Sequence, residues 1–259
     1  MSVDLHDHAL LAIFILSLLL FLAATESGRF FGARATDKSA GHFGTIESAV
    51  LGLLGLLIGF TFAVDVSQFE GRREAVLNEA NAIGTTALRA RLLPAPYASQ
   101  ILKLLQDYVQ IRLDITQRVV SLQELETAIT RSDAIQEALW RRAQAVVAKD
   151  NAMVPTGLFV QTLNEMIDSQ QTRLYAAMKR LPNIVVYGLY GIAAVALGFA
   201  GYASGLAAGR SRLPVYFLGL LIAAVILLIQ DIDRPNAGFI NVSQRPMIDT
   251  AKSIAAYTE

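Results

Sequence analysis

The sequence predicts an all-α membrane protein with four transmembrane helices in two hairpins and an extramembrane helical bundle between the second and third helices. First, only 17% of the 259 residues are charged, against roughly 25% in an average soluble domain. Second, four stretches carry no charge, and each reaches the roughly 17–25 residues that cross a bilayer as a helix. Third, the polar region between them shows helical periodicity without strand alternation. The uncharged stretches are residues 9–25, 48–64, 181–209 and 213–230.

The composition excludes several classes of protein. Lys and Arg together number 22, as do Asp and Glu, and there is no cysteine. Zero net charge without a dense basic run excludes a highly basic nucleic-acid-binding protein, so no nucleic-acid partner is expected. The apolar content of 54% excludes a disordered chain, and the lack of cysteine excludes a disulfide-stapled secreted scaffold.

The first transmembrane hairpin is expected within residues 1–64. Asp4 and Asp7 precede the first apolar run, and no Lys or Arg occurs before Arg29. A cleaved signal peptide begins with positive charge, so this segment is expected to remain as a membrane helix. No proline occurs between Asp65 and Arg91, so the second membrane helix is expected to continue straight out of the bilayer.

Residues 65–182 are expected to form the extramembrane bundle. Pro94 and Pro96 end the long second helix, and another helix with one apolar face begins near Tyr97. Ser121 and Ser132 are predicted N-caps of further helices. A long helix is then expected from residue 155 to near residue 182. The second hairpin follows at residues 183–230, and residues 231–259 are expected to be a polar C-terminal tail.

Small residues on two membrane helices indicate close helix packing. In the second helix, Gly52, Gly55, Gly59 and Ala63 fall in one narrow stripe. This stripe either packs against a helix of the same or another subunit or lines a pore directly. In the third helix, two consecutive GxxxG steps predict a close helix partner; they are formed by Gly201, Gly205 and Gly209.

A different face of the second helix carries a carboxylate at each membrane boundary. Glu47 and Asp65 lie at its ends, with Ile58 and Thr61 between them. If several copies surrounded an axis, carboxylate rings would flank an apolar constriction that concentrates cations and gates by dewetting. Alternatively, the acids simply occupy helix ends, where charge is least costly. Phe60 and Phe62 are competing candidates for an aromatic neck.

The sequence holds no pattern that indicates catalysis. There is no cysteine nucleophile, Walker loop or HExxH zinc motif. His6 and His8 belong to a polar N-terminal segment, and His42 is isolated, so we expect no metal site. The protein is therefore not expected to be an enzyme or to carry a cofactor, and a membrane-embedded enzyme is the least favoured alternative.

A polar cluster follows the fourth apolar stretch. Acids at a membrane edge are costly unless they are paired or hydrated, and nearby arginines such as Arg72 would neutralise them. We expect a structural clasp that ties the C-terminal segment to the bundle, and an ion or ligand site is the alternative. The predicted clasp residues are Asp231, Asp233, Arg234 and Asp249.

Two blocks of the sequence carry a family resemblance. The run from Ser67 to Arg73, S-Q-F-E-G-R-R, resembles the S-x-x-W-E-G-R-[RK] pattern of bacterial bestrophins. The run from Asp233 to Asn236 and the later R-P-M-I-D that ends at Asp249 are similar to the acidic-Pro segment and the closing L-P-L-D of these proteins. With its N-E-A-N-A-I-G and D-I-D-R-P blocks, nearly the whole chain is similar to bacterial bestrophin-like domain proteins.

The resemblance implies an oligomeric channel, pentameric in true bestrophins, in which the second helix lines an apolar neck and a cytoplasmic bundle continues the pore. By position, Phe60, Phe62 and Val64 would lie nearest the neck, and Arg72 and Arg73 near its inner mouth. Phe69 replaces the tryptophan of the family pattern. No acid-rich run follows Pro235, so calcium gating is not expected.

The expected function is therefore a homo-oligomeric channel for small inorganic ions in a bacterial inner membrane, with the lipid bilayer and further copies of the chain as partners. The alternative is a membrane-anchored scaffold or sensor that binds a protein partner. Selectivity stays open, because Glu47 and Asp65 favour cations whereas Arg72 and Arg73 favour anions. The resemblance places the bundle and both termini in the cytoplasm, although positive charges counted over short loops alone favour the opposite orientation.

Overall fold

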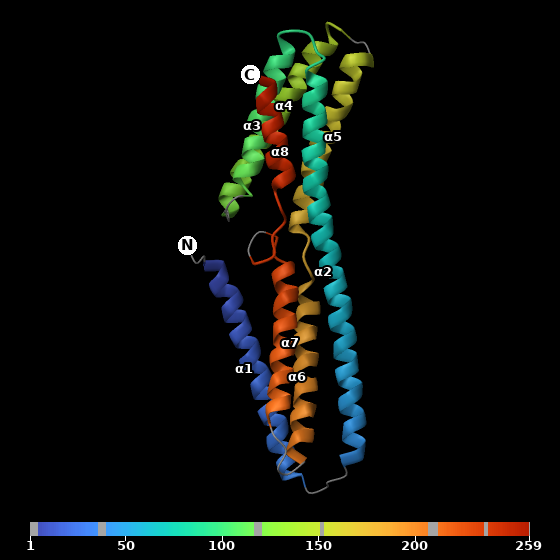
Figure 1. Cartoon of the computed structure of the whole chain (residues 1–259), viewed down its shortest axis with the longest axis vertical. Helices are drawn as coiled ribbons and strands as arrows, with labels where there is room; N and C mark the ends of the chain where they lie inside the picture. The colour runs from blue at the N-terminus through green and yellow to red at the C-terminus, as the bar shows by residue number, and fades with distance from the viewer. Residues whose placement is uncertain are drawn as a thin grey trace. The chain divides into compact units, whose positions relative to one another are not determined.

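The computed structural model describes residues 5–35, 40–116, 121–150, 153–206, 212–235 and 238–258, and these ranges are mainly helical and contain no strand (Figure 1). This confirms the predicted all-α fold. The elements in chain order are α1 (Leu5–Arg34), α2 (Ala40–Ala90), α3 (Tyr97–Asp114), α4 (Leu122–Val147), the short π-helical η1 (Met153–Gly157), α5 (Leu158–Met178), α6 (Asn183–Leu206), α7 (Leu213–Ile232) and α8 (Arg245–Thr258).

The chain forms two compact units. Residues 1–68 and 180–240 make up the first, here called the membrane unit, and residues 69–179 and 241–259 make up the second, the bundle unit. The four helices long and apolar enough to cross a membrane include α1, α2, α6 and α7, which confirms the four predicted transmembrane helices. At most 33% of any of their apolar windows is buried, as expected of helices that face lipid rather than a soluble core.

In the membrane unit, α1, α6 and α7 pack against one another (Figure 1). A Cβ atom added at Gly201 would overlap the carbonyl oxygen of Thr25, and one at Gly205 would overlap that of Arg29. Gly28 and Gly32 of α1 meet the backbone of α6 in the same way. The two backbones therefore approach as closely as small residues permit. Gly209, predicted to extend this contact, lies outside the described residues.

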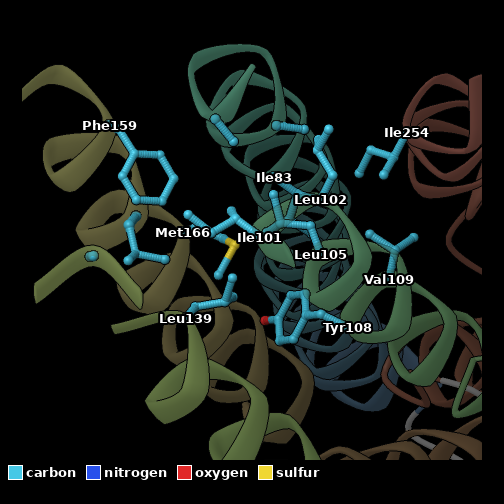
Figure 2. Close-up of a cluster of buried hydrophobic side chains, with 14 of the residues drawn as sticks. Ile83, Ile101, Leu102, Leu105, Tyr108, Val109, Leu139, Phe159, Met166 and Ile254 are labelled. Carbon is cyan, nitrogen blue, oxygen red and sulfur yellow. The ribbon is translucent and has the colours of Figure 1, made fainter. Parts of the chain in front are cut away.

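The bundle unit has its own apolar core. Residues 69–90 of α2 contribute Ile83, around which α3, α4, α5 and α8 supply fully buried side chains (Figure 2). The labelled members include Leu105, Leu139, Met166 and Ile254. Burying each such side chain contributes about 1.5–3 kcal/mol, so this core accounts for the cohesion of the bundle without help from lipid.

The N-cap prediction is confirmed at Ser121 and wrong at Ser132. The Ser121 hydroxyl accepts a hydrogen bond from the Glu124 amide at 3.2 Å, and the Glu124 carboxylate accepts one from the Ser121 amide at 2.8 Å, forming a capping box. Ser132 lies inside α4 and is fully buried. No proline or glycine interrupts residues 122–147, so nothing stops the helix there.

The C-terminal segment differs from the predicted polar tail. Residues 245–258 form α8, and Met247 and Ile254 lie fully buried in the bundle core. The sequence does carry a signal for this helix, because Met247, Ala251 and Ile254 recur at helical spacing. The helix expected to run to near Pro182 ends four residues earlier, as α5 finishes at Met178.

Candidate functional site

One face of α2 is buried against other residues of the same chain. Thr61 and Asp65 are 6% and 0% exposed, and the Thr61 hydroxyl donates a hydrogen bond to the Leu57 carbonyl at 2.8 Å. Leu54 is buried on the same face, Ile58 packs against the core of the membrane unit, and Glu47 is half-buried. Thr61 and Asp65 are therefore covered by residues of their own chain, and the pore-lining role of this face stays a prediction.

The opposite face of α2 is exposed. A Cβ atom added at Gly52, Gly55 or Gly59 would meet nothing within 4 Å among the described residues, and Leu56 and Ala63 are exposed beside them. The small-residue stripe therefore has no helix partner in the described part of this chain. It is available to lipid, to another subunit or to a pore.

The aromatic candidates lie beside this stripe. Phe60 is 64% exposed and Phe62 is 36% exposed, and Val64 is also exposed. At about 100° per residue, Phe60 and Phe62 lie on opposite flanks of the glycine stripe. The structure thus separates the pore-lining candidates into buried ones and exposed ones, and of the exposed ones Phe60 and Phe62 border the glycines.

Further along α2, the same exposed face becomes acidic. Glu70 and Glu74 are exposed and follow Ala63 at helical spacing. Glu70 forms an exposed ion pair with Arg73 at 3.4 Å. Arg72, by contrast, is buried. Of the two arginines predicted at the pore mouth, only Arg73 is on the surface, and its charge is matched by that of Glu70.

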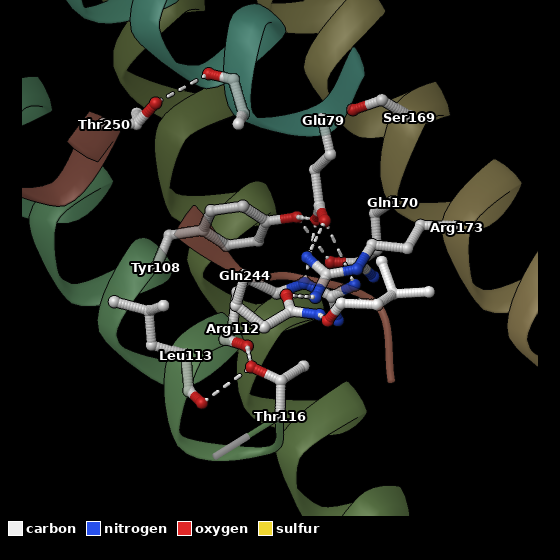
Figure 3. A network of polar contacts seen from close by, with 12 residues as sticks. Glu79, Tyr108, Arg112, Leu113, Thr116, Ser169, Gln170, Arg173, Gln244 and Thr250 are labelled. Carbon is white, nitrogen blue, oxygen red and sulfur yellow. Dashed lines mark hydrogen bonds and ion pairs between the residues drawn. The ribbon is translucent and has the colours of Figure 1, made fainter. Parts of the chain in front are cut away.

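The bundle unit encloses a cluster of charged side chains around Glu79 of α2, which we call the Glu79 cluster (Figure 3). From α3, Arg112 donates from Nε to Glu79 Oε1 at 2.8 Å and from Nη2 to Oε2 at 3.4 Å. From α5, Arg173 donates from Nη1 to Oε2. Two guanidinium groups therefore share one carboxylate that is fully buried.

Neutral side chains surround these charges. The Tyr108 hydroxyl lies 3.1 Å from Glu79 Oε1 and 2.8 Å from Gln170 Oε1, and Gln136 Nε2 donates to Gln170 Oε1 at 3.1 Å. Arg173 Nη2 donates to Gln244 Oε1 at 2.9 Å. Burial raises the pKa of Tyr108, with the nearby Glu79 carboxylate acting in the same direction, so the hydroxyl remains a proton donor. The cluster joins α2, α3, α4, α5 and the segment before α8.

Two of the residues predicted for the clasp, Asp231 and Asp233, form hydrogen bonds at the end of α7. The buried Asp231 carboxylate accepts hydrogen bonds from the amides of Phe239 at 3.0 Å and Ile240 at 3.1 Å. Asp233 accepts one from the Leu181 amide at 2.9 Å. These contacts stay within the membrane unit and fix the two segments that leave it.

The other two residues predicted for the clasp, Arg234 and Asp249, do not take part in these hydrogen bonds. Arg234 is half-buried just after Asp233. Asp249 lies on α8, 3.9 Å from Arg245 of the same helix, with both side chains exposed. No group of three or more His, Asp or Glu residues is arranged to hold a metal ion in the part of the chain that was described.

Comparison with known proteins agrees with this architecture. The sequence matches the family described as "Bestrophin-like domain" over residues 12–247. The chain belongs to the bestrophin-like family. No curated protein matches the sequence.

Solved structures show the same fold. A single-substitution variant of a bacterial bestrophin homologue from Klebsiella pneumoniae shares 15% identity with this bestrophin-like chain, at a TM-score of 0.67, over 98% of this chain and 97% of that one. A second variant of the homologue gives 14% identity and a TM-score of 0.68 over 96% and 98%. A further crystal structure of the homologue, solved by zinc anomalous phasing, gives 15% and 0.64 over 94% and 95%.

Sequence reasoning missed the Glu79 cluster of this bestrophin-like protein and one side of its α1–α6 contact. Glu79 lies in the N-E-A-N-A-I-G block but had no assigned partner. Arg112 follows Tyr108 by four residues on the otherwise apolar face of α3, and a charge at such a position signals a buried ion pair. Gly28 and Gly32 form a GxxxG step in the first membrane helix that mirrors Gly201 and Gly205.

Proposed function

We propose that this protein is a homo-oligomeric ion channel whose pore is lined by the exposed face of α2. The carrying observation is that the small-residue stripe of α2 has no partner among the described residues of its own chain while the opposite face is buried. This face is apolar, and apolar constrictions are known to gate channels by dewetting. Membership of the bestrophin-like family supports the channel function.

The narrow part of the proposed pore is formed by Gly52, Leu56, Gly59 and Ala63. Small side chains let several copies of α2 approach one axis closely, and Leu56 supplies the apolar surface for dewetting. Phe60 and Phe62, on the flanks, contact neighbouring copies of α2. Glu47, Thr61 and Asp65 stay behind the pore wall.

The proposed selectivity is for cations. Beyond the neck, Glu70 and Glu74 continue the pore-facing side of α2, and repetition around the axis makes each position a ring. Arg73 neutralises Glu70, whereas Glu74 has no ion-pair partner among the described residues. The ring of Glu74 therefore supplies the net negative charge. Arg72 is buried and does not offset it.

The proposed subunit number, membrane and orientation follow the family resemblance. Five copies of the chain form the ring, the protein lies in a bacterial inner membrane, and the bundle unit and both termini are cytoplasmic. An enzymatic activity is not part of the proposal, because no described cluster offers a nucleophile with its base.

The test is ion flux from liposomes that contain the purified oligomer. Gly59→Leu should fill the neck and abolish most of the flux. Gly188→Leu on α6 is the matched control, because a Cβ there also meets nothing within 4 Å among the described residues, and it should conduct like the wild type. A well-folded oligomer that passes neither cations nor anions, or a mass in detergent of one or two chains, would contradict the proposal.

A further inference from the structure

The Glu79 cluster has an excess of positive charge. Arg112 and Arg173 both contact the Glu79 carboxylate, and no second carboxylate contacts either guanidinium in the described ranges of the chain. Arg112 is 1% exposed and Glu79 is 0% exposed. An arginine remains protonated under all physiological conditions. These three side chains therefore sum to one net positive charge. A further acid, Asp133, is exposed and reaches the cluster only through Gln170, whose Nε2 donates to Asp133 Oδ1 at 2.9 Å.

One nitrogen of the cluster is also without a hydrogen-bond acceptor. Arg112 uses Nε and Nη2 for Glu79, and its Nη1 has no partner among the described residues although it is enclosed. Buried polar atoms are nearly always hydrogen-bonded in native proteins, and exceptions commonly mark a bound water or ion. A water would accept a hydrogen bond from one N–H of Nη1 but would leave the net charge unchanged.

From these two observations we propose that the Glu79 cluster binds a small inorganic anion at Arg112 Nη1, with chloride as the representative ligand. The anion accepts a hydrogen bond from Nη1 and brings the summed charge of Glu79, Arg112 and Arg173 to zero. A single-atom anion suffices, because Nη1 needs one acceptor and the summed charge needs one negative charge to balance it. Binding requires local opening of the bundle, so exchange is expected to be slow.

The site is separate from the proposed pore and does not depend on conduction. Glu79 lies on the buried face of α2, whereas the pore-lining candidates lie on the exposed face. The anion therefore acts as a structural ligand of the bundle unit, and its concentration sets the stability of that unit through mass action.

The first test is thermal unfolding of the full-length protein in sodium chloride or sodium gluconate of equal ionic strength. The midpoint should be higher in chloride by roughly 5–10 °C when chloride exceeds its Kd about a hundredfold. Arg112→Gln removes the excess charge and should abolish the difference. Arg141→Gln, which removes an exposed arginine paired with Glu137, is the matched control and should retain it. Equal midpoints of the wild type in the two salts would overturn the proposal.

The second test does not rely on a variant that folds. Crystals of the wild-type protein grown in sodium bromide should show an anomalous peak within hydrogen-bond distance of Arg112 Nη1. Bromide peaks confined to other places, or a water without anomalous signal beside Nη1, would also overturn it.

Discussion

Replacing Glu79 by glutamine should destabilise the bundle unit far more than the loss of one surface charge. Glutamine has nearly the shape of glutamate, so the change leaves no cavity. It leaves Arg112 and Arg173 buried without their shared carboxylate, and the new amide group directs N–H donors at guanidinium donors. Removing one partner of a buried ion pair costs about 3–5 kcal/mol. That is a large fraction of the roughly 5–15 kcal/mol that stabilises a folded protein.

The assay is thermal unfolding of the purified full-length protein. At about 2–4 °C per kcal/mol for a chain of this size, Glu79→Gln should lower the midpoint by roughly 6–20 °C. Glu137→Gln is the control, because Glu137 forms an exposed pair with Arg141 at 3.6 Å, and exposed pairs contribute about 0–1 kcal/mol.

A third variant separates charge from packing. Changing Glu79, Arg112 and Arg173 together to methionine removes all three charges, and such replacements are often neutral or stabilising. The triple variant should therefore be more stable than Glu79→Gln. A midpoint for Glu79→Gln equal to that of Glu137→Gln would refute the reasoning.

Three further predictions concern the membrane unit and the pore. Gly201→Val should destabilise the protein by about 1–3 kcal/mol or more in thermal unfolding, because its Cβ would overlap the Thr25 carbonyl; Gly191→Val, where a Cβ meets nothing nearby among the described residues, should change little, and equal losses would contradict this. Glu74→Gln should lower the cation-to-anion permeability ratio roughly fivefold in reversal-potential recordings, and an unchanged ratio would argue against a pore-facing Glu74. Asp231→Asn should cost about 1–3 kcal/mol, because one of two backbone amides loses its acceptor; an unchanged unfolding midpoint would contradict it.

The membrane helices were predictable because hydropathy alone carries their signal. Uncharged runs of bilayer length located α1, α2, α6 and α7, and Pro94 and Pro96 gave the end of α2. The boundaries were less accurate where several residues offer the same local signal. Ser121 and Ser132 are both good N-caps by type, but no proline or glycine ends the helix that starts at Leu122 before it reaches Ser132.

The sequence could not predict which face of α2 is buried, because the residues of both candidate faces recur at helical spacing. One face is buried because it packs against other helices of the same unit. Leu54, for example, belongs to the apolar core of the membrane unit. A single sequence contains no signal for which helix covers which face. The same limit applies to the GxxxG steps of α6. The sequence contains the matching step of α1, but it does not say that these two helices contact each other.

The Glu79 cluster could not be predicted as a whole. Glu79 and Arg112 are 33 residues apart, and Glu79 and Arg173 are 94 apart. A charge on the apolar face of α3 indicates that Arg112 needs a buried partner, but it does not say which of the many acids supplies it. Long-range pairing of charges depends on how the helices assemble.

The central claim is that the exposed face of α2 lines a pore, and chemical block of single-cysteine variants tests it most directly. The chain has no cysteine, so each introduced thiol is the only one per subunit. Gly59→Cys and Ala63→Cys should conduct in liposomes until a charged thiol reagent is added and then lose flux. Leu54→Cys and Thr61→Cys, on the buried face, should keep their flux in the same reagent. Block at residues 54 and 61 without block at 59 and 63 would contradict the account.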